Sequence, residues 1–266
     1  FVLPTFLAFI LGFIAPFAMG VYLSFCKFTT VTDAKFIGFS NYLKIFTDAS
    51  FVHALWYTAL FTVVTVVLIN VLAFAVALLL TKGFRGTNIF RTVFFMPNLI
   101  GGIILGYIWQ LLLNGVLLYM NRTLTYSSVY GFWGLVILMC WQQIGYMMII
   151  YIAGMQSLPT DVLEAASVDG ANGTQTMFKI IIPLTLSGII SGIIMVFVPA
   201  LTSFVISDLL GGGKVLLIGN VIEQEFMQGT NWNLGSGLSV VLMIFVIASM
   251  ALMNIFDKDG GGTAVW

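Results

Sequence analysis

Long stretches without a charged residue are the feature that most constrains the fold of this 266-residue chain. A helix needs roughly 20 consecutive apolar residues to cross the hydrocarbon core of a bilayer. Six stretches are long enough, with hydrophobic cores at 2–25, 56–80, 93–113, 132–153, 180–205 and 234–256. Because a span in lipid must satisfy its backbone hydrogen bonds internally, each stretch predicts one helix. The sequence therefore predicts an all-α integral membrane protein with six transmembrane helices, folded as one transmembrane domain over residues 1–266.

Composition excludes several other classes of protein. Charged residues make up 8% of the chain, whereas soluble domains carry about 25%. The net charge is zero, so no nucleic-acid partner is expected. One histidine and two cysteines offer no metal-ligand spacing, and neither a metal nor a cofactor is expected on this chain. The six cores contain no Asp, Glu, Lys, Arg or His, which argues against an intramembrane enzyme, and no phosphate-binding loop for ATP occurs.

A charged island at residues 158–171 separates the fourth predicted span from the fifth. Pro159 suits the first turn of a helix, where its missing N–H costs nothing. Asp161 and Glu164 follow in or near that turn, where the helix dipole favours negative charge. Gly170 accepts the left-handed conformation that ends many helices. The island therefore predicts a short helix outside the membrane.

A second short helix is expected directly after the island. Thr174 is its predicted N-cap, and Pro183 marks the point where the fifth span is entered or kinked. Residues 156–183 are therefore predicted to form a helix–turn–helix elbow. Further along, the apolar run Val215–Ile222 is too short to cross a bilayer and is predicted to be interfacial or re-entrant.

The elbow contains three sequence groups in a fixed order, namely Glu164-Ala165-Ala166, Asp169-Gly170-Ala171 and Pro183. Together they resemble the EAA loop of the permease subunits of ABC importers. In that family the loop is cytoplasmic and docks in a cleft of the ATPase subunit. The resemblance implies that Glu164 makes a polar contact, that Ala165 and Ala166 allow close approach, and that Gly170 forms the bend. The implied coupling residues are Glu164, Ala165, Ala166, Asp169, Gly170 and Ala171.

The same resemblance implies the partners and the location. The expected partners are two ABC ATPase subunits that bind ATP and Mg, a second permease subunit of the same or a related kind, and an extracytoplasmic substrate-binding protein. The chain is expected to pass several times through the bacterial cytoplasmic membrane, with both termini in the cytoplasm. Charge alone weakly favours this orientation, because Lys82, Arg85 and Arg91 lie close together in one short loop without an acid. A membrane anchor or sensor that transports nothing is the alternative class.

Two parts of the chain resemble different branches of this superfamily. Up to about residue 183 the chain resembles the sugar importers, at residues 36–42, 84–86, 90–97 and 168–171. After that point it resembles the spermidine/putrescine permeases, at residues 207–212 and 217–222. Because more of the chain is sugar-like, a sugar or oligosaccharide is the expected substrate, with a polyamine as the alternative.

Each substrate class predicts its own contact residues. Sugars bind aromatic platforms and neutral hydrogen-bonding groups, which the third and fourth spans supply at Trp109, Gln110, Asn114, Trp141, Gln142 and Tyr146. Polyamines require carboxylates and aromatic faces, and the candidate carboxylates are Asp208, Glu223 and Glu225. Since these three acids lie outside the hydrophobic cores, they are also candidates for an external loop that meets the binding protein.

Overall fold

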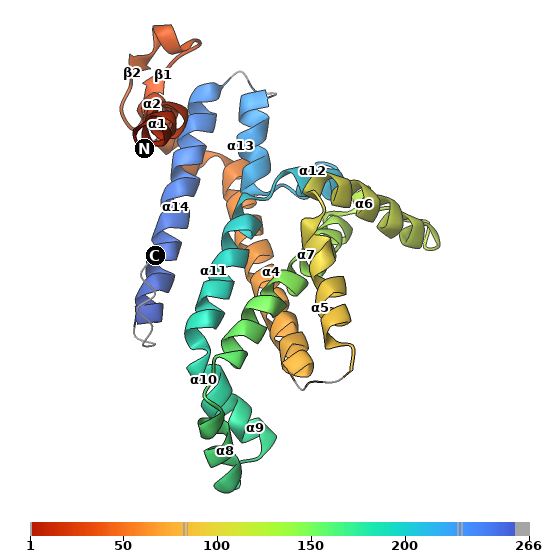
Figure 1. The fold of residues 1–266 in the computed structure, drawn as a ribbon. Helices are drawn as coiled ribbons and strands as arrows, with labels where there is room; N and C mark the ends of the chain where they lie inside the picture. The colour runs from red at the N-terminus through yellow and green to blue at the C-terminus, as the bar shows by residue number, and fades with distance from the viewer. Residues whose placement is uncertain (1, 82, 84, 228, 230, 259–266) are drawn as a thin grey trace.

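The computed structural model describes residues 2–81, 83, 85–227, 229 and 231–258, and Figure 1 shows that most of them are helical. Lys82 and Phe84, used above, lie outside the described residues. The longer helices are α1 (Leu3–Phe9), α2 (Ala15–Ser24), α3 (Ser40–Thr47), α4 (Ala49–Thr81), α5 (Thr87–Phe95), α6 (Gly102–Leu118), α7 (Ser128–Gln156), α8 (Thr160–Val168), α11 (Leu186–Thr202), α12 (Val205–Gly211), α13 (Ile218–Met227) and α14 (Trp232–Lys258). The shorter pieces are α9 (Gly173–Thr176), α10 (Ile182–Leu184), the π turns η1 (Ile10–Ile14) and η5 (Met177–Ile181), and the 3-10 turns η2 (Val31–Asp33), η3 (Met96–Leu99) and η4 (Leu124–Tyr126). An antiparallel hairpin pairs β1 (Cys26–Lys27) with β2 (Lys35–Phe36).

Four helical segments in the described part of the chain are long and apolar enough to cross a membrane without a break. They are Leu3–Ser24, Ala49–Thr81, Ser128–Gln156 and Trp232–Met253, and they correspond to the first, second, fourth and sixth predicted spans. The third predicted span is not one straight helix, and the fifth bends near Pro183, where the sequence predicted that it is entered or kinked. Each is a pair of helices joined at a bend, so the described residues contain four to six spans, according to whether each bent pair counts as one.

Backbone chemistry explains both bends. In the third span, Pro97 lies in the turn η3 and Gly101 is extended (φ −60°, ψ 135°), and the two helical parts meet at 102°. Proline has no N–H to donate and glycine has no side chain to restrict the turn. In the fifth span, the π turn η5 runs into α10 at Pro183, and the two parts meet at 70°. Pro183 therefore lies beside the kink, as predicted.

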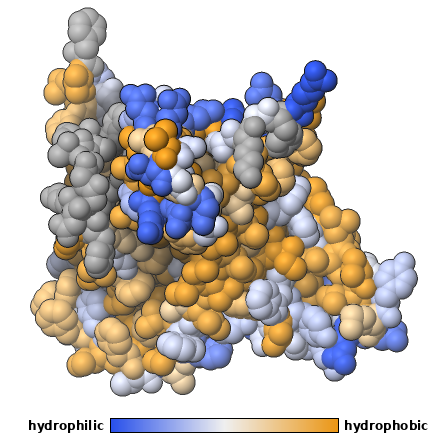
Figure 2. All heavy atoms as spheres, turned by 90° about the horizontal axis from the view of Figure 1, so that it is seen from below, coloured by the Kyte–Doolittle hydropathy of each residue, from blue (hydrophilic) through white to orange (hydrophobic). Residues whose placement is uncertain are grey.

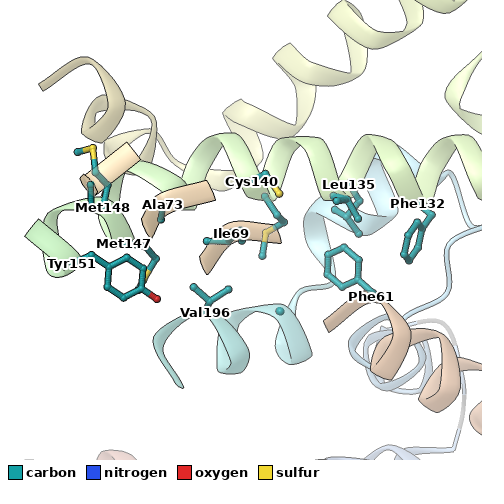
Figure 3. Packing of buried hydrophobic residues seen from close by; sticks show 14 of the residues in the cluster. Phe61, Ile69, Ala73, Phe132, Leu135, Cys140, Met147, Met148, Tyr151 and Val196 are labelled. Atoms are coloured by element: carbon teal, nitrogen blue, oxygen red, sulfur yellow. The ribbon is translucent and has the colours of Figure 1, made fainter. Parts of the chain in front are cut away.

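Helices α4, α7 and α11 form the main apolar cluster, and Figure 3 shows how their side chains meet. Phe61 of α4 packs edge to face on Phe132 of α7, with ring centroids 6.0 Å apart. Ala73 of α4, Met147 of α7 and Val196 of α11 are all fully buried in the same cluster. Between helices in lipid, association depends on close packing because the surrounding acyl chains are as apolar as the side chains.

Gly145 marks a close approach of two helices. A Cβ atom at this position would overlap the Phe94 carbonyl group and lie 2.8 Å from Phe95 N, because the end of α5 crosses α7 there. A Cβ atom at Gly154, on the same helix, would meet no atom within 4 Å. The α5–α7 crossing therefore depends on the missing side chain at position 145.

A buried amide holds α12 and α13 together. Asn220 Oδ1 accepts hydrogen bonds from Ser207 Oγ (2.6 Å) and Leu217 N (3.2 Å), while Asn220 Nδ2 donates to Phe204 O (2.9 Å). Ser207 and Asn220 are both buried, and a paired buried network of this kind favours one arrangement of its helices. The run Val215–Ile222 does not form a helix of its own, since it divides between the loop after α12 and the first half of α13.

Candidate functional site

Local hydrogen bonds build the first half of the elbow between α7 and α11. Helix α8 carries Asp161 in its first turn, where the dipole favours it. At its other end Gly170 has φ +76°, its N–H donates to Ser167 O (3.1 Å), and Ala171 N donates to Ala166 O (2.9 Å). This pair of bonds is a Schellman motif. The prediction that Gly170 ends the helix is confirmed.

The second half of the elbow starts at Asn172, so the prediction of Thr174 as N-cap is wrong. Asn172 Oδ1 accepts from Gln175 N (2.8 Å), and Gln175 Oε1 accepts from Asn172 N (2.9 Å). This reciprocal capping box satisfies two backbone donors at once. A threonine at 174 has no such return bond, which explains why the helix begins earlier.

The elbow presents most of the predicted coupling residues outward. Glu164, Ala165, Asp169 and Gly170 are exposed, whereas Ala166 is buried. Seen from below, hydrophilic side chains gather around the elbow against a mainly hydrophobic surface (Figure 2). Of the two alanines, only Ala165 is therefore available to a partner, because Ala166 packs inside the elbow.

The six candidate sugar contacts do not form a single group. Trp109 of α6 and Trp141 of α7 meet edge to face, with ring centroids 5.4 Å apart. Tyr146 Oη lies 3.3 Å from Met195 Sδ, and Gln142 is half-buried on α7. Two amides bond to the backbone elsewhere, since Gln110 Nε2 donates to Leu209 O (2.6 Å) and Asn114 Oδ1 accepts from Leu124 N (2.8 Å).

Two of the three candidate carboxylates meet at one cavity. This cavity has a volume of about 180 Å³ and is lined by Ile103, Tyr107, Phe204, Val205, Asp208, Leu209 and Glu223. The acids come from α12 and α13 and the phenol ring from α6. They come together because Gln110 ties α6 to the backbone of α12, while Asn220 ties α12 to α13.

Glu225 does not line this cavity. Burial raises the pKa of its carboxyl above the usual range, and the negative charge of Asp48 raises it further. Asp48 is fixed at the start of α4, where its Oδ1 accepts from Ser50 N (2.7 Å). Glu225 therefore belongs to the junction between α13 and the start of α4, and not to the cavity with Asp208 and Glu223.

The chain combines unbroken apolar spans, two bent helix pairs and a charged elbow before the last of these spans, an arrangement of a multi-pass membrane protein. The family model described as "Binding-protein-dependent transport system inner membrane component" matches residues 71–259. The chain belongs to this family, as its elbow predicted. It is a multi-pass permease component of the inner membrane, of the kind found in ABC importers.

Several relatives bear this out in different parts of the chain. The probable starch degradation products permease AmyD of Thermoanaerobacterium thermosulfurigenes is 39% identical over 69% of this chain and 66% of its own length. The probable ABC transporter permease YesP of Bacillus subtilis is 30% identical over 92% of this chain and 85% of its own length. The spermidine/putrescine permease PotB of Haemophilus influenzae is 44% identical, but over 38% of this chain and 35% of its own length.

Solved structures share the fold. A bacterial ABC transporter involved in the import of the acidic polysaccharide alginate superposes with a TM-score of 0.79, at 16% identity, over 98% of this chain and 94% of that one. The MetNI methionine ABC transporter, in an inward-facing conformation, gives a TM-score of 0.60 at 20% identity over 79% and 96% of the two chains.

Sequence reasoning missed two residues of this region, Tyr107 and Asn220. Tyr107 was one of many aromatic residues in a span, and nothing in its surroundings along the chain places it beside α12 and α13. Asn220 stood out more, because an amide within an apolar run requires partners once it is buried. Its position between Leu217 and Val221 was therefore a usable signal.

Proposed function

We propose that this chain is the permease subunit of an ABC importer for a sugar or an oligosaccharide. The family match over residues 71–259 carries the proposal, together with the identity to AmyD, which is named for starch degradation products. Trp109 and Trp141 are the proposed aromatic platform for the sugar, with Gln142 and Tyr146 as neutral partners. Gln110 and Asn114 each use one amide atom in a hydrogen bond to the backbone. The other amide atom of each side chain is proposed to line the path.

The proposed arrangement has six crossings in one domain, 1–266, with each bent pair counted as one crossing. The elbow and both termini face the cytoplasm. Two ABC ATPases supply ATP and Mg chemistry, a second permease subunit completes the path, and an extracytoplasmic binding protein delivers the substrate. Because the elbow lies between the fourth and fifth of six crossings, it lies on the same side of the membrane as both termini in this arrangement.

The elbow is proposed to couple ATP hydrolysis to movement of the helices. Glu164 offers a carboxylate to the ATPase, Ala165 permits close approach, and Asp169 and Gly170 form the turn that reaches into the partner. Ala171 and the buried Ala166 keep this turn in shape through their backbone bond. Because the elbow continues through η5 and α10 into α11, a force on it acts directly on the fifth crossing.

A polyamine is the second candidate substrate, and one observation favours it. Asp208 and Glu223 line the same cavity as the exposed ring of Tyr107. Two carboxylates beside an aromatic face suit an ammonium group. The short match to PotB, at 44% identity, agrees with that possibility. Glu225, which lies elsewhere, is proposed as part of the outer surface.

Uptake assays distinguish these candidates. We would reconstitute the chain with its ATPases, companion permease and binding protein, and measure ATP-driven uptake of a maltooligosaccharide and of spermidine. Sugar uptake alone supports the proposal, and spermidine uptake alone replaces it with the second candidate. In the active system, Glu164→Ala is expected to lower uptake without changing expression, because the residue is exposed and packs on nothing essential. Unchanged uptake would remove Glu164 from the coupling surface.

A further inference from the structure

Two adjoining cavities form a groove that begins at the elbow and runs along α4. The inner cavity, about 520 Å³, is lined by Asn70, Val71, Phe74, Ala75, Leu78, Tyr151, Met177, Phe178, Ile182 and Ile189. The outer cavity, about 590 Å³, is lined by Leu78, Leu163, Ser167, Ala171, Gly173, Thr174, Thr176, Met177 and Ile181. Leu78 and Met177 belong to both linings, so the two cavities lie next to each other.

The inner cavity is suited to an apolar occupant. Its lining is almost entirely hydrocarbon, and its size lies in the range of about 300–1,000 Å³ that bound organic molecules fill. The two polar residues at its wall are already paired, since Tyr151 Oη donates to Asn70 Oδ1 and Asn70 Nδ2 donates to Val66 O (2.7 Å). A cavity without free polar groups holds water poorly.

The groove opens toward the side where lipid is available. Val71 and Phe178, at its wall, are 62% and 60% exposed. Val71 lies within the last third of the unbroken span Ala49–Thr81, so this wall lies within the depth of the bilayer in a membrane. The abundant apolar molecule at that depth is an acyl chain.

The outer cavity has the opposite character. Ser167 and Thr174 are exposed there, and none of the described residues that line either cavity carries a charge. Anionic lipids are recognised by clusters of Lys and Arg, which these linings lack. A groove with an apolar inner part and a polar, uncharged outer part matches a zwitterionic phospholipid.

We propose that this groove binds one zwitterionic phospholipid, with an acyl chain between α4 and the kinked fifth span and the headgroup beside the elbow. The assignment to the cytoplasmic leaflet rests on the proposed orientation of the elbow, whereas the binding site itself does not. The lipid would touch Met177 and Phe178 of η5, the segment through which the elbow joins α11. It would therefore form part of the connection between the elbow and the fifth span.

Photocrosslinking tests the proposal in the assembled transporter. The complex is placed in nanodiscs that contain phosphatidylethanolamine with a photoreactive acyl chain, and adducts are mapped by mass spectrometry. We expect saturable labelling at residues 70–78 and 177–189, and weaker labelling of these residues by phosphatidylglycerol with the same acyl chain. Labelling that rises linearly with lipid, or that favours phosphatidylglycerol, would overturn the proposal, as would crosslinks from the second permease subunit at these residues.

Substitutions at two exposed positions of α4 sharpen the test. Ala75→Trp places a large side chain in the groove and displaces part of the acyl chain. Loss of the burial of two methylene groups weakens lipid binding about tenfold, so labelling should fall by about that factor. Leu79→Trp is the matched control, since Leu79 is 57% exposed and lies outside the linings. Equal labelling in both variants would refute the site. Because the readout is an adduct and not uptake, the result does not depend on which substrate is carried.

Discussion

Replacing Gly145 by alanine should separate two helices of the bundle. The new Cβ atom would overlap the Phe94 carbonyl group and lie 2.8 Å from Phe95 N. Both neighbours are backbone atoms, which cannot rotate away as a side chain would. The α5–α7 crossing must therefore open, and we expect a cost near the upper end of overpacking, about 3 kcal/mol. For a chain of this size that corresponds to a fall in Tm of roughly 6–12 °C.

Thermal unfolding of the purified complex, followed by tryptophan fluorescence, measures this effect. Gly154→Ala is the matched control, because it makes the same change on the same helix where a Cβ would meet no atom within 4 Å. Alanine there should be neutral or stabilising by about 0.5–1 kcal/mol, owing to its better helix propensity. If the two variants melted within a degree or two of each other, the close crossing of α5 and α7 would be wrong.

Three further substitutions test other parts of the structure. Asn220→Leu removes three hydrogen bonds and leaves the buried Leu217 N–H without its acceptor, whereas Ser207 Oγ and Phe204 O keep other partners; it should lower the free energy of unfolding by about 1–3 kcal/mol in a denaturation series. Gly170→Ala places a side chain at φ +76°, which should cost about 1–2 kcal/mol and lower ATP-driven uptake. Burial and Asp48 raise the pKa of Glu225, so ionisation of this carboxyl destabilises the fold as pH rises above 4.5. Glu225→Gln should therefore raise Tm at pH 7. The gain in Tm should disappear toward pH 4, where the carboxyl of Glu225 is protonated in both states.

Each of these has its own control. Ser207→Ala removes one partner of Asn220 and should cost clearly less than Asn220→Leu, and equal losses would contradict the network. Gly173→Ala adds a Cβ in open space of the same elbow, so an equal loss of uptake would show that strain at Gly170 is not the cause. For Glu225→Gln, a gain in Tm that stayed constant between pH 4 and pH 7 would exclude ionisation as the reason.

The sequence predicted the crossings better than their shapes. Charge-free length alone located the four unbroken spans and the two bent pairs, because the bilayer imposes that length directly. The bend after α5 was missed, although Pro97 and Gly101 were visible. A proline in an apolar run is compatible with a straight crossing when neighbouring helices satisfy the freed backbone groups. Whether the chain bends therefore depends on contacts such as Gly145 with Phe94, which are distant in sequence.

The elbow was more predictable than the cavities, for a physical reason. Its turn at Gly170 depends on residues within five positions of each other, so local rules reached it. The start of α9 was harder to predict, because Asn172, Gly173 and Thr174 can each act as an N-cap, and the return bond from Gln175 favours Asn172. By contrast, Tyr107 joins Asp208 and Glu223 through the packing of three helices, and no spacing along the chain encodes that meeting.

The local hydrogen bonds of the elbow bear on how quickly it finds a partner. The Schellman turn at Gly170 and the capping box at Asn172 close on residues 166–175 alone. The elbow thus has its final shape before any other subunit arrives, and association loses little conformational entropy. Its encounter with a partner is then limited by diffusion and orientation instead of by folding. In the proposed coupling, a preformed elbow of this kind would transmit displacement as a rigid body, without first unfolding and refolding.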